Sequence, residues 1–96
     1  MTNSQKKKCA EIMKHYGRAH QQYILQEECA ELIQAVSKIH RGTAGAEEQF
    51  INELADVSIM VEQHVSDMDE DELTEFYKKV NEKLDRQKIR IERGEI

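Results

Sequence analysis

The sequence predicts an all-α fold, a four-helix bundle-like domain. The 96 residues include no proline, and 34% of them are charged against 39% hydrophobic, a profile typical of soluble helical domains. Apolar residues recur at spacings of three and four, which is the helical repeat, and four glycines separate the resulting segments. A chain of this length holds one modest core, so residues 1–96 are expected to form a single domain.

The first two helices are predicted on either side of Gly17. Residues 4–16 carry apolar side chains with helical spacing, and the glycine that follows is a typical helix stop. Residues 19–40 form the second helix, which ends at the basic residue and glycine of positions 41–42. Both boundaries are therefore marked by local signals.

A short connection joins the second helix to the third. The linker 42–45 contains two glycines, so helices 19–40 and 46–65 are expected to be antiparallel neighbours. The fourth helix is predicted over residues 70–93. Asp69, followed three residues later by Glu72, is typical of an acidic N-terminal cap for that helix.

Charge and hydropathy exclude two classes of partner. The net charge of −5 argues against non-specific binding of nucleic acid, which needs a clustered positive face. No apolar run approaches the roughly 18 residues that a membrane span requires, and the polar, basic residues 1–8 do not resemble a signal peptide. A cytoplasmic protein that binds neither nucleic acid nor membranes is expected.

The charge is unevenly distributed along the chain. Residues 67–75 hold six acids and no base, whereas residues 78–93 hold seven bases and three acids. A basic tract beside an acidic site favours a small ligand rich in phosphate.

Cysteine and aromatic residues are expected to serve in packing. Cys9 and Cys29 lie far apart, outside any C-x-x-C motif, and are interpreted as reduced thiols. Four aromatic residues could stack on a nucleobase, but their positions favour the core. They are Tyr16, Tyr23, Phe76 and Tyr77.

Two glutamates fall on the apolar face of the second helix. Advancing about 100° per residue from Ile24, Glu28 and Glu31 fall at about 40° and 340°, inside the apolar stripe. Glu27 lies outside the stripe, at about 300°. Glu28 and Glu31 are thus predicted to face the core.

The third helix repeats this arrangement with an E-x-x-D pair. With Phe50 at zero, Glu53 falls at about 300° and Asp56 at about 240°, on the buried face and its shoulder respectively. The apolar residues that define this stripe are Leu54, Val57, Val61 and Val65. Antiparallel packing would let the two acidic pairs converge.

Four acids aimed into a small core are energetically costly. Each ion removed from water costs several kcal/mol, and like charges repel one another. The second and third helices supply only Lys38 and Arg41 as bases, both near one end, so ion pairing there is poor. An all-oxygen site selects Mg²⁺, or alternatively Mn²⁺, over zinc or copper. The alternative is that these acids belong to ordinary solvated helix surfaces.

At these residues the sequence resembles the MazG-like family of all-α nucleoside triphosphate pyrophosphohydrolases. The matching segments are QEECAEL at 26–32 and NELADV at 52–57, with 21 residues between the two acidic pairs. A third segment, NEKLDR at 81–86, resembles the N-x-K-x-x-R stretch of that family. The resemblance covers residues 23–90, and the ordered triple is more specific than any one segment.

The resemblance implies a reaction and a metal site. Glu28, Glu31, Glu53 and Asp56 would bind the metal. The reaction would convert an NTP or dNTP and water into the (d)NMP and pyrophosphate. A metal-activated water would attack phosphorus, with Glu31 or Glu53 as the catalytic general base.

The resemblance also implies substrate-binding residues on the fourth helix, namely Asn81, Lys83 and Arg86. Lys83 flanks the apolar stripe of this helix and could either reach the site or extend from the core edge into solvent. Arg86 points further away, towards solvent or a second subunit.

Oligomer formation and two other functions complete the predictions. A single short domain cannot easily enclose a nucleotide, so a homodimer or homotetramer is expected. One alternative is a phosphoribosyl-ATP pyrophosphohydrolase, which would use the same arrangement of carboxylates. A non-catalytic helical interaction or regulatory module would instead need no metal.

Overall fold

The chain folds into helices, as the sequence predicts. The computed structural model describes residues 1–95, and over that range it contains four helices and no strand. Their bounds lie within one residue of the expected ones. They are α1 (Asn3–Tyr16), α2 (Arg18–His40), α3 (Ala46–Ser66) and α4 (Glu70–Glu92). The all-α prediction is confirmed.

Local signals set the helix boundaries. Gly17 ends α1 and directly precedes α2. Its φ angle of 88° is one that favours glycine. The predicted cap of α4 is present, because the Glu72 backbone N–H donates to Asp69 Oδ1 at 2.8 Å. In return, the Asp69 N–H donates to Glu72 Oε1 at 3.4 Å, which completes a capping box.

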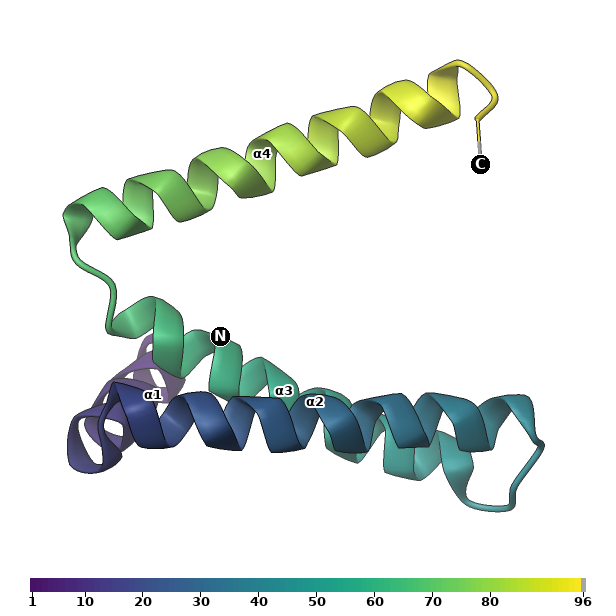
Figure 1. Cartoon of the computed structure of the whole chain (residues 1–96), viewed down its shortest axis with the longest axis horizontal. Helices are drawn as coiled ribbons and strands as arrows, with labels where there is room; N and C mark the ends of the chain where they lie inside the picture. The colour runs from purple at the N-terminus through teal and green to yellow at the C-terminus, as the bar shows by residue number, and fades with distance from the viewer. Residues whose placement is uncertain (96) are drawn as a thin grey trace.

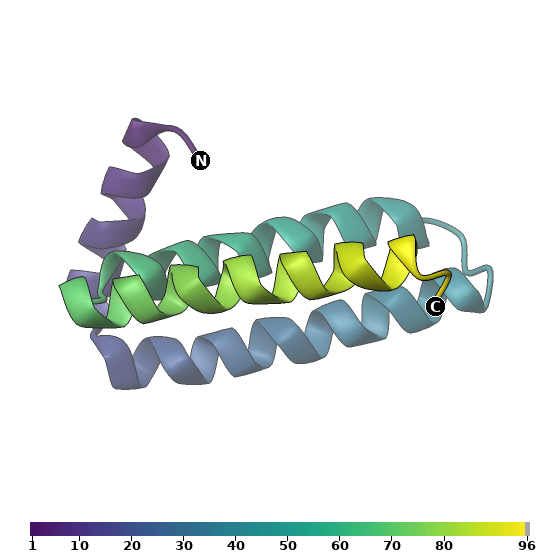
Figure 2. The same ribbon diagram turned by 90° about the horizontal axis from the view of Figure 1, so that it is seen from above.

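Helices α2 and α3 form an antiparallel hairpin, and α1 packs across its open end (Figure 1, Figure 2). The core extends from this junction along the interface between α2 and α3. Its buried apolar residues are Cys9, Met13, Ala35, Ala46 and Met60. The small side chain of Ala35 permits close approach of α2 and α3. Within residues 1–95, α2 and α3 are therefore the most extensively packed pair of helices.

The buried face of α3 differs from the apolar stripe that the sequence predicts. Its centre carries Glu53, Met60 and Gln63, whereas Leu54 is 44% exposed and Val61 is also exposed. The burial of Gln63 is compensated, because its Oε1 accepts a hydrogen bond from Gln21 Nε2 at 2.7 Å. Since α1 and α2 both pack on the face of Glu53, the apolar stripe is turned partly towards solvent.

Helix α4 extends away from the other three helices (Figure 1). None of the side chains from Glu70 to Glu92 is buried. The start of α4 is held by Arg18, whose Nε donates to Asp67 Oδ2 at 2.7 Å and whose guanidinium also contacts Glu72 at 3.4 Å. Within residues 1–95, the packed part of a single copy thus consists of α1, α2 and α3.

Candidate metal centre

Three carboxylates from the α2–α3 hairpin converge on one point. Glu28 of α2 and Glu53 and Asp56 of α3 each offer an oxygen, and these oxygens lie within 4.8 Å of one another. Glu53 and Asp56 are three residues apart on one helix, so both project from the same face. The antiparallel hairpin brings Glu28 opposite that face. One member of the predicted α2 pair, Glu28, therefore meets both members of the α3 pair across the hairpin.

The cluster is partly removed from solvent. Glu53 is only 8% exposed, and Glu28 and Asp56 are half-buried. One oxygen of Glu28 and one of Glu53, Oε2 in each case, are buried and accept no hydrogen bond from the described residues. Burying a carboxylate oxygen without a donor costs free energy, and a bound cation would offset this cost.

Burial and mutual repulsion perturb the acids. The pKa of Glu28 is raised above its ordinary value, first by burial and then by the negative charges of Glu31, Asp56 and Glu53. The pKa of Glu53 is also raised, again mainly by burial, with further contributions from Glu31 and Asp56. The neighbouring Asn52 side chain acts in the opposite direction and lowers the pKa of Glu53. In both residues the charged form is therefore disfavoured, and a bound cation would counter this shift.

The protein's own bases do not neutralise the cluster. Across the described residues 1–95, the ion pairs join Arg18 to Asp67 and Glu72, and Lys79 to Glu75. Lys38 of α2 instead donates to the side-chain oxygen of Gln49 at 3.2 Å. The poor local pairing expected from the sequence is therefore seen in the structure.

Glu31 lies beside this cluster but differs from its other members. It is close enough to raise the pKa of both Glu28 and Glu53. Its side chain is exposed, and it is outside the group of converging oxygens. The sequence predicts all four acids as ligands, whereas the geometry separates three inner oxygens from one outer carboxylate.

The donor set suits a hard divalent cation. Within residues 1–95, this is the one group of at least three acidic, histidine or cysteine side chains with converging donor atoms, and it contains neither His nor Cys. Carboxylate oxygens alone favour Mg²⁺ or Mn²⁺ over softer metals. The two unpartnered oxygens fit such an ion.

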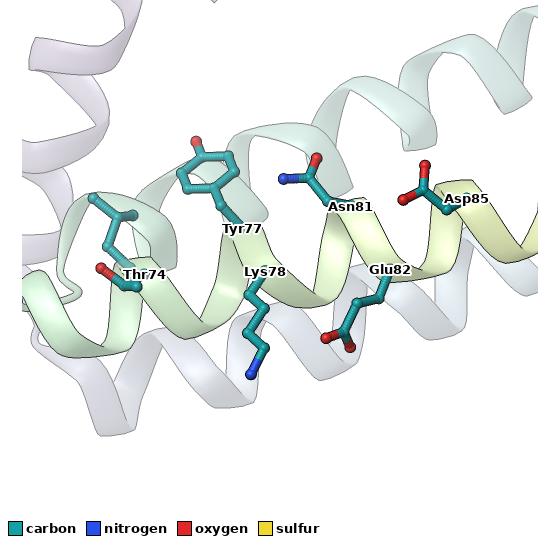
Figure 3. Close-up of a pocket in the computed structure, with 7 residues that line it drawn as sticks. Thr74, Tyr77, Lys78, Asn81, Glu82 and Asp85 are labelled. Atoms are coloured by element: carbon teal, nitrogen blue, oxygen red, sulfur yellow. The ribbon is translucent and has the colours of Figure 1, made fainter.

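The predicted substrate-binding residues lie on α4, apart from the carboxylates. Asn81, Lys83 and Arg86 are all exposed. Figure 3 shows that Asn81 projects to the same side of α4 as Tyr77 and Asp85, along a shallow surface hollow. Every residue that lines this hollow belongs to α4, so no second element closes over it. A single copy does not bring these three residues to the metal centre.

Two further observations refine the sequence interpretation. The expected core packing is wrong for the three tyrosines, which are all exposed, Tyr23 by as much as 71%. Asn52 was not predicted as part of the site. Its only sequence signal is its position immediately before Glu53 in the NELADV segment.

No protein-family model, curated protein or solved structure matches this chain. The resemblance in residues 23–90 thus depends on the sequence segments themselves. Across the helices that the structure describes, none is both long and apolar enough to cross a membrane.

Proposed function

We propose that this protein is an Mg²⁺-dependent nucleoside triphosphate pyrophosphohydrolase of the MazG-like kind. It would hydrolyse an NTP or dNTP to the (d)NMP and pyrophosphate. The observation that carries the proposal is the convergence of Glu28, Glu53 and Asp56, two of which have buried oxygens without a donor. Mn²⁺ is an alternative cofactor with the same ligand preference.

The electrostatics of the cluster support a cation as part of the reaction. A triphosphate carries several negative charges and would be repelled by four neighbouring carboxylates. Glu28, Glu53 and Asp56 would hold the cation through their inner oxygens. When bound, the cation supplies charge neutralisation for the phosphates and makes a water molecule more acidic.

Glu31 is the better candidate for the general base. A base must be free to accept a proton from water, and Glu31 is exposed and outside the converging group. Glu53 is 8% exposed, which suits a ligand more than a proton acceptor in contact with solvent. We therefore assign proton transfer to Glu31, and metal binding to Glu53.

The phosphates would be contacted from α4. Asn81 offers an amide, and Lys83 and Arg86 offer charged donors suited to phosphate oxygens. Because α4 stands apart from the hairpin in a single copy, these residues would reach the substrate through a homodimer or homotetramer, or through a swing of α4. We place the activity in the cytoplasm, where both nucleotides and Mg²⁺ are abundant.

Pyrophosphate release tests the proposal directly. The full chain would be incubated with canonical and modified NTPs, dNTPs and phosphoribosyl-ATP, with Mg²⁺, Mn²⁺ or EDTA. We expect metal-dependent release that Glu53→Gln lowers by a factor of at least about 100. Glu47→Gln, on the exposed surface of the same helix, is the matched control and should retain activity.

Other results would change the assignment. Strong preference for phosphoribosyl-ATP over every nucleoside triphosphate would indicate the related pyrophosphohydrolase reaction. Activity that survives Glu53→Gln would remove the carboxylate cluster from the mechanism. A protein without metal-dependent hydrolysis or metal binding would instead be a helical interaction module.

A further inference from the structure

Helix α4 carries a seam that is typical of a coiled coil. Its members alternate at spacings of four and three residues along nearly the whole helix, which is the heptad pattern. They are Leu73, Tyr77, Val80, Leu84, Gln87 and Ile91. Five of the six are apolar or aromatic, and the pattern is sustained for about 27 Å of helix.

Most of the seam is left uncovered by the described residues 1–95 of a single copy. Leu84 is 55% exposed and Ile91 is 75% exposed, although both occupy the centre of the stripe. The other members are also exposed or at most half-buried. Figure 1 shows α4 diverging from the hairpin, with the two closest near the first turn of α4. This end of α4 is braced by Arg18, through Asp67 and Glu72.

The charges of α4 are self-complementary. Residues 70–75 contain four acids and no base, whereas residues 78–93 contain seven bases and three acids. Two copies of such a helix attract one another when they run in opposite directions, since each acidic end then faces a basic end. A parallel pair would instead place the two acidic ends together and the two basic ends together.

We propose that α4 pairs with α4 of a second copy of this chain as an antiparallel two-helix coiled coil. The two-fold axis passes near residue 82, so that Leu73 packs on Ile91 of the partner subunit. In the same register Val80 meets Leu84 of the partner subunit, and Tyr77 meets Gln87 of the partner subunit. The polar Tyr77–Gln87 contacts favour this register over others. The proposal does not depend on the hydrolytic activity.

Sedimentation of the full chain tests the interface. The wild type should sediment as a species of twice the 11.2 kDa chain mass at micromolar concentration. Leu84→Asp places a charge in the seam twice per dimer and should raise the dissociation constant by at least about 100-fold. Ile89→Asp makes the same kind of change on the opposite face of α4 and should leave the dimer intact.

Cysteine cross-linking tests the direction of pairing. Leu73→Cys and Ile91→Cys chains would be oxidised separately and as a mixture, with linked peptides identified by mass spectrometry. The antiparallel register predicts a 73–91 disulfide in the mixture and none joining two copies of position 73. A 73–73 disulfide would contradict the antiparallel orientation. This test does not require the Leu84→Asp variant to fold.

Two outcomes would refute the interface itself. A monomeric wild type whose melting temperature falls with Leu84→Asp would show that α4 folds back on its own hairpin. A dimer that persists in a helical Leu84→Asp variant would place the contact on another surface. Loss of hydrolysis alone would not bear on the pairing, because oligomeric state is measured without substrate.

Discussion

Glu28→Gln should stabilise the metal-free protein and remove most of the stabilisation that Mg²⁺ provides. In the metal-free protein, the substitution removes a partly buried charge whose oxygen lies within 4.8 Å of Asp56. Two unit charges at that distance repel by about 1 kcal/mol in a water-like medium and by about 3 kcal/mol at an intermediate dielectric. Because Glu28 is only half-buried, solvent screening favours the lower figure.

The expected shifts in melting temperature follow from these energies. For a domain of this size, about 1 kcal/mol corresponds to about 4–8 °C, so metal-free Glu28→Gln should melt at least about 4 °C above the wild type. With a dissociation constant on the order of 1 mM, about 10 mM Mg²⁺ would stabilise the wild type by about 1.4 kcal/mol. The variant lacks one ligand and should lose most of that increase.

Thermal denaturation followed by circular dichroism, in EDTA or in Mg²⁺ at near-neutral pH, measures both shifts. Glu27→Gln is the matched control, because it removes the same charge from an exposed position one residue away. It should neither raise the metal-free melting temperature to the same extent nor abolish the Mg²⁺ effect. Equal behaviour of the two variants, or a wild type insensitive to Mg²⁺, would refute the reasoning.

Three other perturbations probe the same structure. Since burial raises the pKa of Glu28 and Glu53 above 4.5, their ionisation opposes folding above the raised values and this penalty is absent below about 4.5. As the pH falls from neutral to mildly acidic, the metal-free wild type should therefore gain stability relative to a Glu28→Gln/Glu53→Gln variant. A difference in melting temperature between the two proteins that does not change with pH would contradict this. Gln63→Ala leaves the buried Gln21 amide without its acceptor and should cost about 1–3 kcal/mol in urea denaturation, whereas a loss near zero would mean that water replaces the bond. Arg18→Gln should accelerate hydrogen exchange in the first turn of α4 roughly several-fold while leaving the exchange of the α2–α3 hairpin unchanged, and equal acceleration in both would contradict a local role.

Helix bounds were predictable because short-range signals determine them. Gly17 ends α1, the glycine-containing linker reverses the chain after α2, and the Asp69 capping box starts α4. Each signal acts over a few residues. The secondary structure could therefore be predicted almost completely from the sequence.

The exposure of the acidic residues was only partly predictable. Periodicity placed both Glu28 and Glu31 inside the apolar stripe of α2, yet Glu28 is half-buried and Glu31 is exposed. It predicted the burial of Glu53 but not the exposure of Leu54. A helical wheel shows which side chains share a face, whereas the packing of α1 and α2 on α3 decides which face is covered.

The position of α4 could not be derived from its own sequence. Its apolar seam indicates that something packs against it, but a seam does not specify whether the partner is the same chain or another. The same holds for the predicted substrate-binding residues Asn81, Lys83 and Arg86. Their distance from the carboxylates depends on the angle between α3 and α4 and not on spacing along the chain. The substrate-binding predictions therefore remain predictions.

Because Arg18 holds only the start of α4, a small rotation there moves the far end of the helix by a large distance. A helix of 23 residues is about 34 Å long, so a rotation of only about 10° at the first turn displaces its far end by about 6 Å. A small shift of the Arg18 guanidinium relative to Asp67 and Glu72 would therefore produce a larger displacement at the basic end of the helix. Substitutions in a three-residue turn would be felt most strongly at side chains that never touch it.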